Sequence, residues 1–134
     1  MSELNKIALK ILSNGKGILA ADESNGTMTK RLDSVNIESS PETRLLFRET
    51  LFAAKSMKDC IGGVILYDET INQTSNLGKT IPSMISETGA VPGIKVDTGA
   101  KDLANSLDEK ITEGLDGLRE RLKKYYELGA RFTK

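Results

Sequence analysis

A lysine and an aspartate stand close together in the segment Gly93–Asp97, which reads GIKVD. Side chains alternate across a strand, so Lys95 and Asp97 share one face while Ile94 and Val96 share the other. Two charges on one face of an apolar strand must meet partners or solvent, because burying them alone is costly. An uncharged lysine can attack a carbonyl group, whereas a charged lysine binds phosphate. The spacing leaves both roles open, and it is also typical of a Lys–Asp ion pair that serves only the fold.

A second candidate is the loop Asp22–Thr27, with the sequence DESNGT. Asp22 follows a short apolar run, and the hydroxyl groups of Ser24 and Thr27 lie where a helix is predicted to begin. Backbone N–H groups at a helix N-terminus bind anions. Lys30 and Arg31 add positive charge on the next turn. The loop therefore indicates an anion site, although an ordinary capped turn would have the same composition.

Histidine is absent from the sequence, and Cys60 is the single cysteine. No Ser-His-Asp or Cys-His arrangement can form, and no histidine can hold zinc. Any chemistry must therefore use Lys, Asp, Glu, Ser, Thr, Tyr or Arg, which favours a metal-free mechanism. We also expect no cofactor. One cysteine excludes an internal disulfide and is typical of a reducing compartment. Its place before an apolar strand predicts an inert thiol in the core.

Charge and hydropathy exclude two further classes of partner. The sequence has 19 basic and 19 acidic side chains, which gives no electrostatic basis for binding nucleic acid. No apolar run approaches the ~18 residues of a membrane helix, and the first residues lack a secretory signal pattern. We expect a cytoplasmic protein with no membrane or nucleic-acid partner.

Helix and strand signals alternate along the chain. Apolar runs predict strands over 17–21, 61–67 and 92–97, and a further strand begins at the ARFTK end. Helical periodicity predicts helices over 4–12, 28–35, from Ser40-Pro41 to about 57, 82–87 and 115–125. The third of these helices has apolar residues around most of its circumference, which predicts burial on more than one side. The polar stretch 98–113 leads to the last of these helices and is assigned no element.

This alternation predicts a parallel sheet with helical crossovers in one α/β domain. Two architectures fit: a complete open sheet of the flavodoxin-like kind, and the first half of a (β/α)8 barrel, which needs about 250 residues in full. In either case Asp22 and the acidic pair Asp68 and Glu69 end strands at one edge, and Lys95 and Asp97 lie near the same end of the third strand. That edge is the mouth at which barrel active sites lie. Solvated loop charges would fit Asp68 and Glu69 equally well.

Four ordered segments together resemble class I fructose-1,6-bisphosphate aldolase: GKGILAADES, CIGGVILYDET, GIKVDTGA and EGLDGLRERLKKYYELGARFTK. The resemblance runs from about Leu4 to Lys134. It implies a (β/α)8 barrel with parallel strands, and so favours the second architecture. It also implies cleavage of fructose 1,6-bisphosphate to dihydroxyacetone phosphate and glyceraldehyde 3-phosphate. The family performs this reaction through a lysine Schiff base, without a metal ion.

The resemblance assigns roles to individual residues. Asp22 matches the aspartate that contacts substrate near the bond that breaks. Lys95 matches a catalytic-site lysine that contacts substrate by charge, which argues against Lys95 as the Schiff-base lysine. Lys134 matches a further active-site lysine on the fourth strand. All three are expected to be catalytic-site residues.

Substrate-binding residues are assigned in the same way. Ser24 matches a serine at the phosphate of the glyceraldehyde half. Thr27 stands where animal members have a phosphate-contacting serine, and it retains the hydroxyl group. Arg31 matches an arginine associated with substrate phosphate, and Lys95 also contacts the sugar phosphate.

The resemblance also implies what the chain lacks. Residues 1–134 are expected to be the N-terminal half of the barrel domain, truncated at the start of strand four. The Schiff-base lysine of the family lies beyond Lys134, so we expect the 134-residue chain alone to be inactive. The full-length protein is expected to be a cytosolic glycolytic enzyme and a homo-oligomer. An alternative is a non-catalytic module that binds a sugar phosphate or another protein.

Overall fold

The structure is a computed structural model that describes all 134 residues. In chain order the elements are α1 (Glu3–Leu12), the 3-10 helix η1 (Ser13–Gly15), β1 (Gly17–Ala21), α2 (Asn25–Asp33), α3 (Pro41–Phe52), α4 (Met57–Cys60), β2 (Ile61–Leu66), α5 (Asp68–Ile71), α6 (Ile81–Glu87), β3 (Val91–Ile94), β4 (Gly99–Asp102), β5 (Lys110–Glu113), α7 (Leu118–Glu127) and β6 (Phe132–Thr133). None of these helices is long and apolar enough to cross a membrane.

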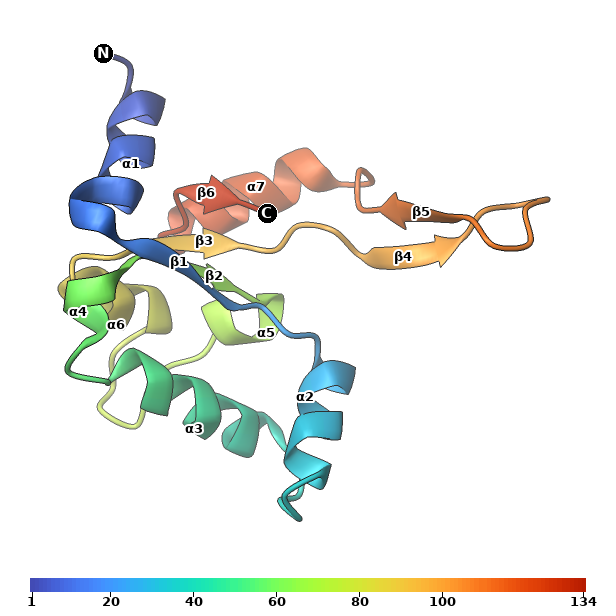
Figure 1. The fold of residues 1–134 in the computed structure, drawn as a ribbon, viewed down its shortest axis with the longest axis horizontal. Helices are drawn as coiled ribbons and strands as arrows, with labels where there is room; N and C mark the ends of the chain where they lie inside the picture. The colour runs from blue at the N-terminus through green and yellow to red at the C-terminus, as the bar shows by residue number, and fades with distance from the viewer.

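Four strands form one parallel sheet in the order β1-β2-β3-β6 (Figure 1). The predicted strand 17–21 is confirmed with the same bounds. β2 ends at Leu66, one residue earlier than predicted, because α5 begins at Asp68. β3 covers Val91–Ile94. Lys95 and Asp97 thus follow β3, whereas the prediction placed both residues inside the strand.

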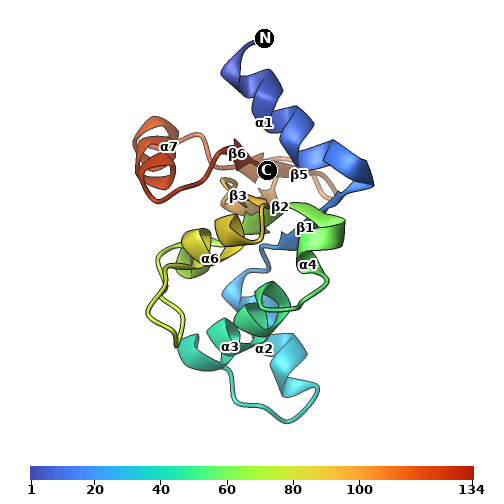
Figure 2. The ribbon, with the colours of Figure 1, turned by 90° about the vertical axis from the view of Figure 1, so that its left-hand side faces the viewer.

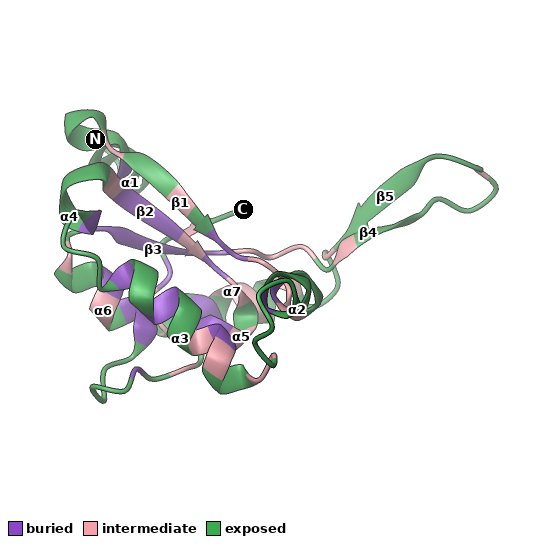
Figure 3. Cartoon of the chain, turned by 60° about the horizontal axis from the view of Figure 1, so that its bottom comes forward, coloured by how far each residue is buried: buried purple, intermediate pink, exposed green.

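Helices α3 and α6 pack on one face of this sheet, whereas α1 lies on the other side of it (Figures 1 and 2). Alternation along β2 sends Val64 and Leu66 to the helix face, where both are fully buried. Phe52 of α3, Ile85 of α6 and Tyr125 of α7 belong to the same core cluster. Figure 3 shows β2 and β3 largely buried, whereas much of β1 is exposed. The second face of the sheet is therefore open along β1. The residues that alternate with Val64 and Leu66 along β2 point toward this second face.

The α3 helix begins as predicted and packs in an unpredicted way. Ser40 caps it, with Pro41 in the first turn. The expected burial on several sides is wrong, because the outward face carries apolar residues and the inward face carries charges. The buried residues are Arg44, Arg48, Glu49 and Phe52, and the exposed large apolar residues are Leu46, Phe47 and Leu51. The inward charges meet polar groups at the ends of β1 and β2, as described below.

Residues 98–113 contain an antiparallel hairpin of β4 and β5, where no regular structure was predicted. The hairpin projects away from the sheet, and most of its residues are exposed (Figures 1 and 3). Gly114 has a φ of 140° where the chain returns toward the sheet, and a Cβ there would lie 2.9 Å from the Cα atom of Asp97. A glycine is required at this return point because of both the conformation and the close approach.

Glycine residues in β2 and β3 allow α1 and β6 to lie close against the sheet. A Cβ on Gly62 would lie 1.8 Å from the carbonyl oxygen of Ile11, so α1 contacts the backbone of β2 directly. A Cβ on Gly93 would lie 2.4 Å from the ring of Phe132. The absence of a side chain at Gly93 allows the Phe132 ring to lie against β3. The end of β6 is thereby placed beside the end of β3.

Gly93→Ala is expected to lower the free energy of unfolding by about 1–3 kcal/mol, because the added methyl group overpacks the Phe132 ring. Gly17→Ala is the matched control, since a Cβ at Gly17 meets no atom within 4 Å. Urea unfolding of both variants measures the difference. Equal midpoints for the two variants would contradict the packing described for Phe132.

Candidate active site at the mouth of the sheet

One row of side chains crosses the carboxyl ends of all four parallel strands. The last paired residues are Ala21 with Leu66, Leu66 with Ile94, and Ile94 with Thr133. The next residue after each strand therefore belongs to one row, and backbone bonds from Lys95 N to Leu66 O and from Lys134 N to Ile94 O continue the ladder there. The row consists of Asp22, Tyr67, Lys95 and Lys134. All four have the parity of the face opposite the helix-packed core.

The two ends of this row meet. Lys134 Nζ donates a hydrogen bond to Asp22 Oδ2 at 2.6 Å, although β6 and β1 are the outer strands of the sheet. Three strand spacings in a flat sheet would separate these strands by about 14 Å. Curvature of the sheet toward its open face, together with the length of the lysine side chain, closes this gap. The Asp22 side chain is 8% exposed and that of Lys134 is 52% exposed.

Charge pairing favours the protonated form of Lys134. The hydrogen bond to the Asp22 carboxylate raises the pKa of Lys134 above its ordinary value of 10.5, and Coulombic attraction acts in the same direction. The amine is therefore an ammonium ion at neutral pH. An ammonium group has no free electron pair, so Lys134 is suited to bind an anion or stabilise negative charge and unsuited to attack a carbonyl.

Lys95 and Asp97 form the ion pair that the sequence left open. Lys95 Nζ donates to the Asp97 carboxylate and also to the Asp97 carbonyl oxygen at 3.1 Å. The hydrogen bond from Lys95 lowers the pKa of Asp97. The pair lies at the mouth and both side chains are partly exposed. It is therefore available to a ligand, in addition to any contribution to the fold.

The N-terminus of α2 faces the same mouth. Ser24 is the N-cap residue, and its Oγ accepts from the backbone N–H of Thr27 at 3.4 Å. The two hydroxyl groups lie 3.1 Å apart. Arg31, two turns later, pairs with Glu23 at 2.5 Å and has a side chain that is 55% exposed. The loop predicted as an anion site is thus a capped helix start with a cation beside it.

All six residues predicted for the site line one open cavity of about 550 Å³. They are Asp22, Ser24, Thr27, Arg31, Lys95 and Lys134. Three cations and three carboxylates meet in this cavity as pairs. An anionic ligand can exchange for the carboxylate partner of each exposed cation, so the cavity is suited to a ligand that carries phosphate and hydroxyl groups.

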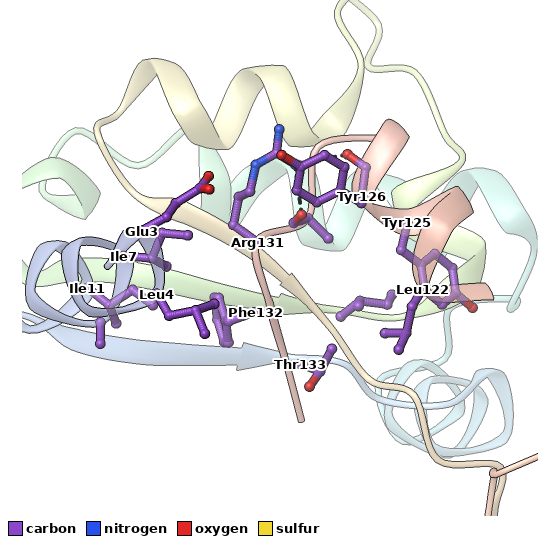
Figure 4. Close-up of a pocket in the computed structure, with 13 residues that line it drawn as sticks. Glu3, Leu4, Ile7, Ile11, Leu122, Tyr125, Tyr126, Arg131, Phe132 and Thr133 are labelled. Atoms are coloured by element: carbon purple, nitrogen blue, oxygen red, sulfur yellow. Dashed lines mark hydrogen bonds between the residues drawn. The ribbon is translucent and has the colours of Figure 1, made fainter. Parts of the chain in front are cut away.

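A second cavity of about 500 Å³ shares no lining residue with the mouth. It lies between α1 and α7, and Figure 4 shows Leu4 and Ile7 of α1 facing Phe132 and Leu122 across it. Its lining is mainly apolar and includes no lysine. None of the site residues predicted from the sequence lines this second cavity, whereas all of them line the mouth cavity.

The acidic pair after β2 lies close to the mouth but does not line its cavity. Asp68 Oδ1 accepts a hydrogen bond from Tyr125 of α7 at 2.8 Å. Glu69 is held by Arg44 of α3 through Nε at 2.9 Å and Nη2 at 2.6 Å. Both acids thus tie helices to the end of β2. The Arg44 hydrogen bonds lower the pKa of Glu69.

This shift predicts the pH dependence of stability. Because the folded-state pKa of Glu69 is lowered below its ordinary value of 4.5, the Arg44–Glu69 pair stabilises the fold above about pH 4.5. That stability is lost as pH falls through the folded-state pKa. We expect Glu69→Gln to be less stable at pH 7 and to lose less stability than wild type between pH 7 and pH 3. Urea unfolding across this range tests the prediction, and parallel curves for the two proteins would contradict it.

Sequence reasoning missed two features of the site. Tyr67 could have been found from strand parity, because it occupies in β2 the row position of Lys95. Glu23 had no local signal, because its partners Arg31 and Arg48 lie on two different helices. The expectation of a core thiol is wrong, since Cys60 at the end of the short helix α4 is exposed. No group of three His, Cys, Asp or Glu side chains is placed to hold a metal ion.

The chain is similar to known proteins over nearly its whole length. The family model described as fructose-bisphosphate aldolase class-I matches residues 3–134. A probable fructose-bisphosphate aldolase class 1 of Xylella fastidiosa is 49% identical over 100% of this chain and 40% of its own length. The cytosolic fructose-bisphosphate aldolase 6 of Arabidopsis thaliana is 50% identical over 98% of this chain and 37% of its own.

A solved structure gives the same result for the fold. The fructose-bisphosphate aldolase of Plasmodium falciparum superposes with a TM-score of 0.94 at 44% identity, over 98% of this chain and 38% of that one. The chain spans about two fifths of the length of these relatives. The chain belongs to the class-I fructose-bisphosphate aldolase family, and its four parallel strands correspond to the N-terminal part of that family's (β/α)8 barrel.

Proposed function

We propose that this chain is the N-terminal half of a (β/α)8 barrel enzyme that cleaves fructose 1,6-bisphosphate to dihydroxyacetone phosphate and glyceraldehyde 3-phosphate. The observation that carries the proposal is the row of Asp22, Tyr67, Lys95 and Lys134 across the strand ends, closed by the 2.6 Å bond between Lys134 and Asp22. Family membership and the share of each relative that the chain spans support it.

In this proposal the reaction divides between the two halves of the barrel. A lysine beyond residue 134 forms a Schiff base with the substrate ketone and releases water. Cleavage then removes the proton of the C4 hydroxyl, breaks the C3–C4 bond and moves its electron pair into the iminium group. Asp22 contacts the substrate where this bond breaks, and the Lys134 ammonium stabilises negative charge at the same place.

The phosphate-binding part of the proposal uses the remaining cations and hydroxyls. Arg31, Ser24 and Thr27 surround the start of α2, whose free N–H groups favour an anion. They are proposed to bind the phosphate of the glyceraldehyde half. Lys95, which lines the same cavity, is proposed to contact substrate by charge. We further propose that the full-length protein is a cytosolic homo-oligomer.

A coupled assay for triose phosphate tests the proposed function. The full-length protein is expected to turn over fructose 1,6-bisphosphate without added metal, and the 134-residue chain is expected to show no turnover above background. Full-length protein without aldolase activity would overturn the proposal. Turnover by the isolated chain would contradict the assignment of the nucleophile to the second half.

A non-catalytic sugar-phosphate-binding module is the second candidate. It is favoured by one observation: Lys134 and Lys95 are both paired with carboxylates, so the cations of this chain are suited to binding. Calorimetric titration of the isolated chain with fructose 1,6-bisphosphate separates the two functions. Saturable heat from the isolated chain, together with an inactive full-length protein, would favour the binding module.

A further inference from the structure

Arg48 is the most deeply buried charged residue of the chain, and the reaction proposed above does not use it. It lies on the inward face of α3 and is 0% exposed. Burial lowers the pKa of Arg48, while attraction to Glu23 and Glu69 acts against this effect. An arginine taken out of water is costly unless its donors are matched by acceptors. The position of those acceptors therefore shows what the guanidinium holds.

The guanidinium connects the loop that follows β1 with α5, the short helix that follows β2. Its Nη2 donates to the backbone carbonyl oxygen of Glu23 at 2.5 Å and lies 3.6 Å from the Glu23 carboxylate. Its Nη1 donates to Oγ1 of Thr70, which is fully buried, at 2.7 Å. The ring of Tyr67, a member of the mouth row, lies 6.0 Å from the guanidinium carbon. A planar group with fixed donor directions thus joins the backbone after β1 to α5.

Glu23 lies between Asp22 and Ser24, which both line the mouth. Fixing its carbonyl oxygen fixes the peptide plane that joins Glu23 to Ser24, and therefore restricts the backbone on both sides. Asp22 is buried and has Lys134 as its side-chain partner, so a small rotation of this backbone would move its carboxylate away from the ammonium. Glu23 also lines the cavity, whereas Arg48, which holds its carbonyl oxygen, does not.

The polar cluster around Arg48 and Glu23 has more unpaired hydrogen-bonding atoms than a cluster that serves stability alone would have. Glu23 Oε2 and Arg48 Nε are buried without a hydrogen-bond partner, and so is Oδ1 of the neighbouring Asn25. Unpaired buried polar atoms are rare in native proteins and cost stability. Departures of this kind concentrate at functional sites. The arrangement is better explained by the placement of the Glu23 backbone than by stability.

We propose that Arg48 is a positioning residue for the mouth: it holds the Glu23 carbonyl so that Asp22 meets Lys134 and Ser24 caps α2. The proposal rests on the proposed function for its catalytic consequence, but its geometric content is independent of activity. Arg44 provides the comparison. It lies one turn earlier on the same helix and is also buried, and it holds Glu69 without contacting Glu23.

The test compares Arg48→Lys with Arg44→Lys in the full-length protein. Both variants remove a buried arginine from α3, so both are expected to lower the thermal midpoint. At a temperature where both are folded, we expect kcat/KM for fructose 1,6-bisphosphate to fall at least tenfold in Arg48→Lys and less than threefold in Arg44→Lys. In an Asp22→Asn background, Arg48→Lys should cause little further loss, because its effect acts through Asp22. Equal losses in the two lysine variants, or full additivity with Asp22→Asn, would overturn the proposal.

Crystal structures of the two variants give a readout that does not depend on activity. The contact between Lys134 Nζ and Asp22 Oδ2 is expected to exceed 3.5 Å in Arg48→Lys and to remain near 2.6 Å in Arg44→Lys. An intact contact in both would overturn the proposal. Wild-type protein without aldolase activity would instead overturn the proposed function, and the crystal structures would still decide the role of Arg48. Arg48→Met, which removes the buried charge together with its donors, replaces the lysine variant if that variant does not fold.

Discussion

Asp22→Asn in the full-length protein is expected to lower kcat for fructose 1,6-bisphosphate cleavage by about 10²–10⁴-fold, the range for a lost acid–base or charge contact in the transition state. The substitution keeps the shape of the side chain and removes its charge. Asp22 is buried, and its carboxylate is the partner of the Lys134 ammonium at the mouth. A neutral amide can neither accept a proton from a substrate hydroxyl group nor hold that ammonium by charge.

Steady-state kinetics with the coupled assay measure this loss. Asp102→Asn is the matched control, because Asp102 also pairs with a lysine but lies on the projecting hairpin with a side chain that is 85% exposed. The control is expected to keep wild-type kcat and KM. A change in kcat of less than tenfold for Asp22→Asn would exclude Asp22 from the bond-breaking step.

Lys134→Met is expected to lower kcat/KM by about 10²–10³-fold, as expected when one group that stabilises developing charge is removed. Lys134 lies opposite Asp22 in the mouth row, and its raised pKa keeps the charge present through neutral pH. Methionine preserves most of the length of the side chain and removes the ammonium. Because the pKa is raised, deprotonation of Lys134 should leave the pH profile of kcat/KM unaffected between pH 6 and pH 9.

Two controls separate charge from packing in this experiment. Lys110→Met removes a lysine that pairs with Asp102 on the hairpin and is expected to leave kcat/KM unchanged. The double variant Asp22→Asn/Lys134→Met is expected to be little less active than the less active of the two single variants. The effects of substituting two groups in direct contact are not additive. Full additivity would show that the two side chains act independently and would contradict the pairing seen across the mouth.

The parallel sheet was predictable because each central strand is a short apolar run between turn residues. β1 was predicted with its bounds because Gly17 and Asp22 bracket it. The end of β3 was predicted too late, because the run through Val96 continues the apolar pattern after pairing has stopped. Periodicity records which residues are apolar, whereas a strand end also depends on where its neighbour turns into a helix.

The packing of α3 could not be predicted from apolar residues. Leu46, Phe47 and Leu51 indicated a buried face, yet they are exposed. The inward face is charged because it meets the polar ends of β1 and β2, where Glu23, Glu69 and Thr70 provide acceptors. Such a match depends on residues far apart in sequence. The β4–β5 hairpin was missed because its residues are mostly polar and its strands have only each other as partners.

Sequence analysis predicted the residues of the site more fully than it predicted their partners. Asp22 and Lys95 were found because charges at the ends of parallel strands collect at one edge. Arg31 was noted as a cation beside the predicted anion site, and the resemblance to class I aldolases added Lys134. The partner of each group depends on curvature and helix placement: Lys134 with Asp22 across the sheet, and Arg48 with Glu23 beneath it. Neither pair has a signature in the spacing of the residues.

Borohydride trapping tests the central claim most directly. Full-length protein is incubated with dihydroxyacetone phosphate, the Schiff base is reduced to a stable secondary amine with borohydride, and the modified peptide is identified by mass spectrometry. The division of roles described here predicts one modified lysine, beyond residue 134, with Lys95 and Lys134 unmodified. A stoichiometric adduct on Lys95 or Lys134 would contradict it, because it would make a charge-paired lysine of this chain the nucleophile.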